Sequence, residues 1–257
     1  MEQNRYPQFL LIGDSHIQYM NQLRDGFAFA AGLSTHVERR LDVINRGFSG
    51  YNSSHLLHIL EHIIPSTSAA KVDYILVLLG SNDSCLPESP TGQHISLPEY
   101  QRNITTIVNR FLNDTDPKKL FLVTPPPVNE IHLQEASDGQ TLTRHQSFTA
   151  KYAQVVREVA EELNDQRVVL VDLWSAIMQK ARLSTPDQGE DALPGSKASG
   201  DNEQLREFLS DGLHLTGAGY KIFLNNVLKA MGDDWKDESS DHKDSWVFPR
   251  WEDAPKC

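Results

Sequence analysis

The feature that most constrains the fold of this chain is a regular alternation of short apolar runs with amphipathic helical patterns. Five runs are rich in β-forming residues, at 9–12, 43–45, 74–79, 120–124 and 168–172. They are mostly continuous rather than alternating, which is typical of strands buried on both faces of a parallel sheet. Patterns with helical spacing occupy residues 27–41, 53–64, 98–113, 145–164 and 216–231.

Strands that alternate with helices predict a doubly wound α/β domain. We expect a three-layer α/β/α arrangement with a five-stranded parallel sheet in the flavodoxin-like order 2-1-3-4-5. Ser96 and Glu99 form a capping-box pattern at the start of the third helix. Residues 183–204 are polar and rich in Gly, Pro and Ser, which indicates a long loop. Whether this loop closes over a site as a lid is left open.

The domain is expected to span residues 1–231, followed by an acidic tail at 232–257. This tail carries four large aromatic residues: Trp235, Trp246, Phe248 and Trp251. Such side chains are too apolar to stay in solvent, so we expect the tail to pack on the domain or on a partner subunit. A homodimer is therefore one expectation.

Charge and composition exclude several classes of function. The net charge of -11 argues against a nucleic-acid surface and against binding to anionic membranes. No segment approaches the ~20 apolar residues of a membrane span, and the N-terminus lacks the apolar core of a signal peptide. Cys85 and Cys257 are the only cysteines, so no disulfide framework is implied. We expect a cytoplasmic protein.

Polar residues that could carry chemistry follow the predicted strands. In an open parallel sheet, sites form beyond the carboxyl ends of the strands. Small or polar segments occur there at 13–15, 47–50, 80–83 and 124–127, and another at 210–214 precedes the last helix. The strand order would bring the first three of these segments side by side.

Ser15 is the candidate nucleophile, and His214 is the candidate base that would activate it. Asp211 lies three residues before His214 and could accept a hydrogen bond from one imidazole nitrogen, leaving the other to deprotonate Ser15. A structural alternative exists for each residue. Ser15 could only cap a helix, and Asp211 with His214 could be an exposed loop pair.

Gly50 and Asn82 are the candidate oxyanion-hole donors, together with the backbone N–H of Ser15. Glycine at position 50 would leave room for the carbonyl of a substrate, and the Asn82 amide donates without bringing a charge. Gly47 competes with Gly50 for this role. Asp14 and Asp83 are expected to support their loops by hydrogen bonding rather than to act as acids.

These segments resemble the four sequence blocks of the SGNH hydrolases, the GDSL lipase/esterase family. The blocks are Gly13-Asp14-Ser15, Gly50 within RGFSGYN, Gly80-Ser81-Asn82-Asp83, and Asp211-Gly212-Leu213-His214, and the resemblance spans residues 8–230. Within the family, LDVINRGFSGYNS, TPPPVNE, DGLHLTGAGYKIF and SWVFPRWEDAP are most similar to the isoamyl acetate-hydrolysing esterases. His16 departs from the pattern, because the family more often has Ile or Thr there. We expect this side chain to line the pocket or the surface.

The resemblance implies hydrolysis of small acetate-type carboxylic esters, as in lipid degradation, without a metal or other cofactor. A thioesterase or a carbohydrate deacetylase would use the same residues. A non-catalytic binding protein on the same fold is the alternative from another class.

Two further patterns suggest a different nucleophile and a metal site, but neither is well supported. Residues 47–51 nearly match a G-x-S-x-G nucleophile elbow but lack its last glycine. One predicted helix carries four potential metal ligands: His55, His58, Glu61 and His62. They lie opposite its apolar stripe, so a solvated face is the simpler interpretation.

Overall fold

The computed structural model describes residues 6–139, 141–182, 193–232, 235 and 246–254. Five parallel strands form one sheet in the order β2-β1-β3-β4-β5, which confirms the predicted topology. The strands are β1 (Gln8–Gly13), β2 (Asp42–Gly47), β3 (Val72–Leu78), β4 (Lys119–Val123) and β5 (Val168–Val171). Every residue of the central strand β3 is buried, as its continuous apolar run predicts.

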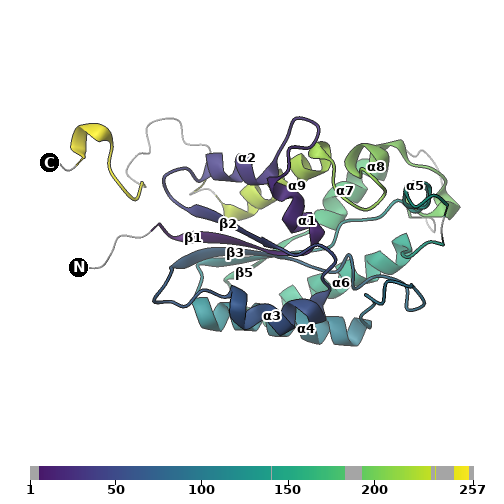
Figure 1. The fold of residues 1–257 in the computed structure, drawn as a ribbon, viewed down its shortest axis with the longest axis horizontal. Coiled ribbons are helices and arrows are strands. Elements are labelled where there is room, and N and C mark those ends of the chain that lie inside the picture. The colour runs from purple at the N-terminus through teal and green to yellow at the C-terminus, as the bar shows by residue number, and fades with distance from the viewer. Residues whose placement is uncertain (1–5, 140, 183–192, 233–234, 236–245, 255–257) are drawn as a thin grey trace.

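Helices cover both faces of the sheet, so the predicted three-layer arrangement is also confirmed (Figure 1). One layer contains α1 (Ser15–Gln18), the 3₁₀ turn η1 (Tyr19–Asn21), α2 (Phe29–His36), α7 (Leu173–Arg182), α8 (Glu203–Phe208) and α9 (Gly217–Met231). The other contains α3 (Ser53–Ile63), α4 (Leu97–Thr115) and α6 (Gln146–Leu163). Because side chains alternate along a strand, Phe9 belongs to the core on one face and Leu10 to the core on the other.

Two local expectations are corrected by the structure. The helix expected over 27–41 is shorter, since α2 ends at His36 and Arg39 adopts a left-handed φ of 60°. The predicted capping box at Ser96 is wrong, because Ser96 is the N-cap residue but its side chain makes no cap hydrogen bond; Pro98 lies in the first turn of α4. A capping box does occur at α3, where Asn52 accepts from the N–H of His55 and donates its own N–H to that imidazole.

Short elements that were not expected from the sequence include α5 (Glu130–Ala136), η2 (Lys197–Ser199) and α8. Each is too short to show a clear helical period. In the segment 183–204, which was expected to be one loop, residues 183–192 lie outside the described residues. The remainder folds back on the domain, since the carbonyl of Gly195 accepts the N–H of Glu130 at 2.8 Å.

The described part of the C-terminal tail contacts the turn after α2. The N–H of Val247 donates to the carbonyl of Arg39 at 3.0 Å, and the Arg39 guanidinium lies 3.8 Å from the centre of the Trp246 ring. The tail then forms the 3₁₀ turn η5 (Trp251–Asp253), where Trp251 is exposed. The homodimer stays a prediction.

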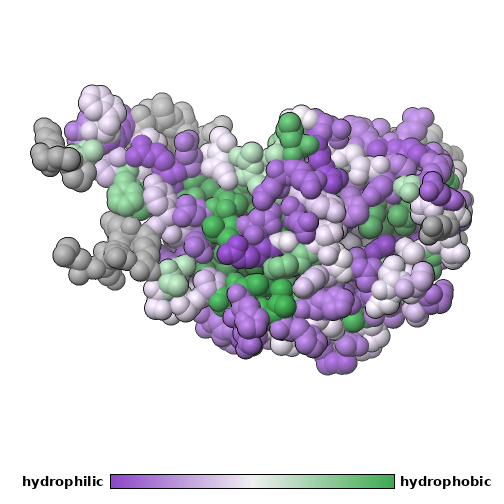
Figure 2. All heavy atoms as spheres, in the orientation of Figure 1, coloured by the Kyte–Doolittle hydropathy of each residue, from purple (hydrophilic) through white to green (hydrophobic). Residues whose placement is uncertain are grey.

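The surface that shows the β2 edge carries a group of apolar side chains between α2 and α3 (Figure 2). Ile44 of β2 and Ile59 of α3 are partly buried hydrophobic residues that pack against the core on the α3 side. Among the described residues, no helix has the length and apolar character needed to span a membrane.

Candidate active site

Two segments that are far apart in the sequence meet at the carboxyl edge of the sheet, where Ser15, His214 and Asp211 form a hydrogen-bonded series. The Nε2 of His214 lies 3.0 Å from the Oγ of Ser15. The Nδ1 of the same imidazole lies 2.7 Å from the Oδ2 of Asp211. Because a carboxylate only accepts, Nδ1 carries a proton, and in the neutral ring Nε2 is free to accept the serine proton.

The turn that carries Asp211 and His214 is held by backbone contacts. The Oδ1 of Asp211 accepts the N–H groups of Leu213 and His214 at 2.9 and 2.7 Å. Gly212 has a φ of +81°, and a Cβ there would lie 2.3 Å from the backbone nitrogen of Leu133 in α5. Glycine is therefore required here both by conformation and by space.

The ionisation of Asp211 suits an orienting carboxylate. Burial alone would raise its pKa, but the hydrogen bonds from the imidazole and N–H of His214 outweigh burial and hold the pKa well below its usual range. Asp211 therefore stays charged at neutral pH, where it can hold the Nδ1–H of His214.

Ser15 is the first residue of α1 and follows directly on β1. Asp14 is the N-cap of this helix, and its Oδ1 accepts the N–H of His16 at 2.9 Å. The first N–H groups of a helix have no partner within it, so the N–H of Ser15 is available as a donor. Burial raises the pKa of Asp14 to about 7, although the bond from His16 opposes the shift.

Asn82 and Gly50 follow the two strands that flank β1. The Nδ2 of Asn82 donates to the carbonyl of Tyr51 at 2.9 Å, which links the segments after β3 and β2. This bond uses one of the two amide hydrogens and leaves the second for another acceptor. Gly50 has a φ of +82°, so its backbone conformation is the reason for glycine in the structure.

Gly47 is not available as a donor. Its N–H already donates to the Oδ1 of Asn45 at 2.9 Å, and a Cβ at Gly47 would lie 2.0 Å from the backbone nitrogen of Gln18. Glycine is required at this position because β2 and α1 lie too close together for a side chain. Asp83 serves its loop by accepting the N–H of Ser53 at 2.8 Å.

Two residues of this region escaped the sequence analysis. The Nη2 of Arg144 donates to the Oδ1 of Asn82 at 3.0 Å, and the Nε2 of Gln93 donates to the same oxygen at 3.3 Å and to the carbonyl of Gly50 at 2.8 Å. Both side chains come from loops between elements, where no hydrophobic period or motif singles them out.

The expectation for His16 is wrong, since its side chain is buried rather than on a pocket wall or the surface. The ring lies 5.7 Å from that of His214, centre to centre. Among the described residues, neither ring nitrogen has a hydrogen-bond partner. Burial, followed by the charge that His214 can carry, holds the pKa of His16 well below its usual range. His16 is therefore a neutral neighbour of the candidate base.

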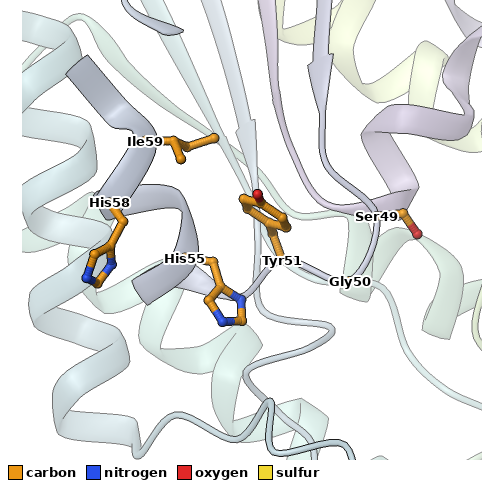
Figure 3. Close-up of a pocket in the computed structure, with 6 residues that line it drawn as sticks. All are labelled: Ser49, Gly50, Tyr51, His55, His58 and Ile59. Carbon is orange, nitrogen blue, oxygen red and sulfur yellow. The ribbon is translucent and has the colours of Figure 1, made fainter. Parts of the chain in front are cut away.

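A pocket of about 560 Å³ opens beside Gly50 (Figure 3). It runs along the first turns of α3 and is lined by six residues: Ser49, Gly50, Tyr51, His55, His58 and Ile59. The Tyr51 ring lies 5.4 Å from that of His55 in an edge-on arrangement. The pocket thus extends away from the candidate oxyanion donor over aromatic and imidazole groups.

The imidazoles on α3 are not assembled into a metal centre. Within the part of the chain that the structure describes, no group of three or more His, Cys, Asp or Glu residues is placed to hold a metal ion. His62 contacts Glu61 at 3.6 Å, and both side chains are exposed.

Comparison with known proteins places this geometry in context. The family model of the GDSL-like lipase/acylhydrolases matches residues 11–222. The chain is 32% identical to a bovine (Bos taurus) isoamyl acetate-hydrolyzing esterase 1 homolog over 227 residues, covering 86% of this chain and 80% of the relative. The human (Homo sapiens) homolog is 30% identical with the same coverage. A GDSL esterase/lipase of Arabidopsis thaliana is 28% identical over 90% of this chain, which spans 66% of that relative's length.

Solved structures share the fold. An acetylxylan esterase from Geobacillus stearothermophilus superposes with a TM-score of 0.62 at 20% identity, covering 91% of this chain and 98% of the neighbour. A lipase/acylhydrolase from Enterococcus faecalis has a TM-score of 0.56 at 21% identity, covering 87% and 94%.

Proposed function

The chain belongs to the GDSL-like lipase/acylhydrolase family, and we propose that it is a serine esterase for small acetate-type carboxylic esters. The observation that carries the proposal is the continuous series from Ser15 Oγ through the His214 imidazole to the Asp211 carboxylate, with distances of 3.0 and 2.7 Å. The similarity to isoamyl acetate-hydrolyzing esterase homologs supports the acetate-ester class.

Catalysis would proceed through an acyl-enzyme. Ser15 attacks the ester carbonyl while the Nε2 of His214 takes its proton, and Asp211 stabilises the imidazolium. The oxyanion is held by the N–H groups of Ser15 and Gly50 and by the Asn82 amide. His214 then protonates the departing alcohol. A water molecule, deprotonated by the same imidazole, attacks the acyl carbon; the bond to Ser15 Oγ then breaks, the imidazolium returns the proton to that oxygen, and the acid leaves.

The test combines turnover with active-site labelling. Purified protein should hydrolyse p-nitrophenyl acetate and isoamyl acetate, with rates that fall as the acyl chain lengthens. A fluorophosphonate should add its phosphonyl mass to Ser15, and the Ser15→Ala variant should neither be labelled nor hydrolyse ester. Absence of both turnover and labelling in the wild-type protein would favour the alternative of a non-catalytic binding protein.

Metal independence is part of the proposal, because base, nucleophile and oxyanion donors are all side chains or backbone groups of this chain. Dialysis against a strong chelator should leave kcat for p-nitrophenyl acetate unchanged. A loss that added Zn²⁺ or Mg²⁺ restores would contradict it.

A second candidate, deacetylation of a hydroxyl-rich alcohol, is favoured by the pocket beside Gly50. The Nδ1 of His58 lies 2.7 Å from the carbonyl of Ser54, so the neutral ring donates there and leaves Nε2 as an acceptor. The Nδ1 of His55 accepts the N–H of Asn52, which leaves its Nε2–H as a donor. A donor and an acceptor beside the Tyr51 ring suit sugar hydroxyls. Comparing kcat/KM for acetylated xylose and isoamyl acetate separates the two candidates.

A further inference from the structure

We propose that Arg144 and Gln93 are positioning residues for the oxyanion hole, which orient and polarise the Asn82 amide toward the reacting carbonyl. The inference rests on the proposed ester hydrolysis at Ser15. Neither residue belongs to the four sequence blocks, and both act through Asn82 and Gly50 rather than on the substrate.

Arg144 is a buried cation, and two of its side-chain hydrogen bonds go to the segment after β3, while Nη1 donates to the Oγ1 of its neighbour Thr143 at 3.1 Å. Its side chain is only 6% exposed, and it lies in the loop before α6. Its Nε donates to the carbonyl of Ser81 at 2.6 Å, and its Nη2 donates to the Oδ1 of Asn82 at 3.0 Å. No carboxylate of the described residues lies within ion-pair distance. Burying an unpaired guanidinium is costly, so its placement against Asn82 calls for a functional reason.

Arg144 determines which way the Asn82 amide points. A guanidinium has donors and no acceptor, so it must face the amide oxygen. In the opposite orientation, the amide NH₂ would face the guanidinium N–H groups and its oxygen would face the carbonyl of Tyr51. Both contacts would be repulsive. The orientation with Nδ2 toward Tyr51 at 2.9 Å is therefore the one that Arg144 allows, and it leaves the second amide hydrogen for the oxyanion.

The guanidinium also strengthens the donor. A hydrogen bond from a cation to the amide oxygen withdraws electron density from the amide nitrogen, and serial hydrogen bonds reinforce one another where water is excluded. Charge develops on the substrate oxygen only as the tetrahedral state forms. The benefit therefore appears in kcat rather than in KM.

Gln93 connects the two donors of the hole. Its Nε2 donates to the carbonyl of Gly50 at 2.8 Å and to the Oδ1 of Asn82 at 3.3 Å. Its own carbonyl accepts from the Asn52 side chain, which caps α3, at 2.9 Å. Gln93 thus links the peptide group that follows the Gly50 N–H to the Asn82 amide across two loops.

The experiment compares Arg144→Lys, Arg144→Met and Gln93→Leu with wild-type protein. We expect Arg144→Met to lower kcat for p-nitrophenyl acetate by ~10- to 100-fold with KM little changed, since it removes part of an oxyanion donor's effect. Arg144→Lys keeps a donor-only cation and should recover most of kcat. Gln93→Leu should lower kcat by about tenfold, because it also weakens the stabilisation of the oxyanion by the Asn82 amide.

A trifluoromethyl ketone separates this role from a purely structural one, because Ser15 adds to it and forms an oxyanion in the same hole. Its inhibition constant should rise by the same factor as kcat falls. Arg167→Gln is the matched control, since it removes a guanidinium bonded to Asp165 at the opposite end of the sheet, before β5. Circular dichroism should show that each variant is folded. If Arg144→Met does not fold, the kcat and the inhibition constant of Gln93→Leu still decide.

Folded Arg144→Met and Gln93→Leu variants with kcat and inhibition constant within threefold of wild type would overturn the inference while the wild type remains an esterase. So would variants that raise KM alone. Absence of ester turnover in the wild type would instead refute the proposed function.

Discussion

The imidazole of His214 lies 3.0 Å from the hydroxyl of Ser15, although 199 positions separate the two residues in the chain. Two further hydrogen bonds join the segments around Ser15 and His214. The hydroxyl of Tyr220 in α9 donates to the carbonyl of His16 at 2.7 Å, and the Arg24 guanidinium donates to the carbonyl of Leu215 at 3.1 Å. The contact between Ser15 and His214 is thus stabilised by hydrogen bonds between the segments that flank these two residues in the sequence.

Replacing the members of this series should show a graded loss of activity. We expect Ser15→Ala and His214→Ala each to lower kcat by ~10⁵-fold or more, and Asp211→Ala by ~10⁴-fold, by analogy with other serine hydrolases. The double variant Ser15→Ala/His214→Ala should be no slower than either single one, because the two groups act as a unit. Steady-state kinetics with p-nitrophenyl acetate measure this. Additive losses would argue that the two side chains act separately.

Removal of the side-chain oxyanion donor should affect turnover rather than binding. Asn82→Ala should lower kcat by ~10²–10³-fold and leave KM close to the wild-type value. Asn226→Ala is a suitable control, since its amide bonds the carbonyl of Ile222 within α9. An Asn82→Ala enzyme with wild-type kcat would refute the assigned role.

Gly212 should tolerate no side chain. In Gly212→Ala, the Cβ would meet the backbone of α5 at 2.3 Å from Leu133 N, and the residue would also have to adopt a φ of +81°. Gly200→Ala is the matched control, because Gly200 has a φ of +77° with no atom within 4 Å of its Cβ position. We expect the control to lose ~1–3 kcal/mol of unfolding free energy, because its φ of 77° and ψ of −176° are unfavourable for alanine. Gly212→Ala should lose more and should also have a lower kcat. Equal effects of the two changes on urea unfolding and kcat would contradict this.

Asp14 should make the protein less stable as the pH rises. Its pKa is raised to about 7 by burial in the folded state, compared with 3.8 for the unperturbed group. Between these values the unfolded chain has lost the proton that the folded chain keeps, so the unfolding free energy falls with increasing pH, by up to about 1.4 kcal/mol per pH unit. Asp14→Asn should remove this slope while its side-chain oxygen still accepts from His16.

Urea unfolding of both proteins from pH 4 to pH 8 measures the difference. The stability of Asp14→Asn relative to wild type should increase up to about pH 7 and then level off. Burial also raises the pKa of Asp83, to about 6, so Asp83→Asn provides a comparison whose relative gain should level off earlier. A constant difference between Asp14→Asn and wild type across this range would show that Asp14 titrates normally.

The sheet and most of the candidate site were predictable because their signals are local. Strands such as β3 are short continuous apolar runs, and polar residues directly after a strand must lie at the edge of the sheet where parallel strands end. Ser15, Gly50 and Asn82 carry that signal, whereas Asp211 and His214 were identified from their spacing in the segment before the last helix. The cap at Ser96 failed because a favourable residue at the N-cap does not guarantee the side-chain bond. His16 was misplaced because burial depends on what packs over a residue.

Local patterning of the chain was sufficient for the layer architecture, the strand order and the residues that would bear the chemistry. Packing alone decided that Arg144 and Gln93 lie behind Asn82, that His16 is buried beside His214, and that a glycine is needed against α5 at Gly212. The reason is that a sequence motif indicates only the chemistry of which its residue types are capable. Hydrogen-bond partners from distant loops, and the exclusion of water around them, exist only once the layers have closed.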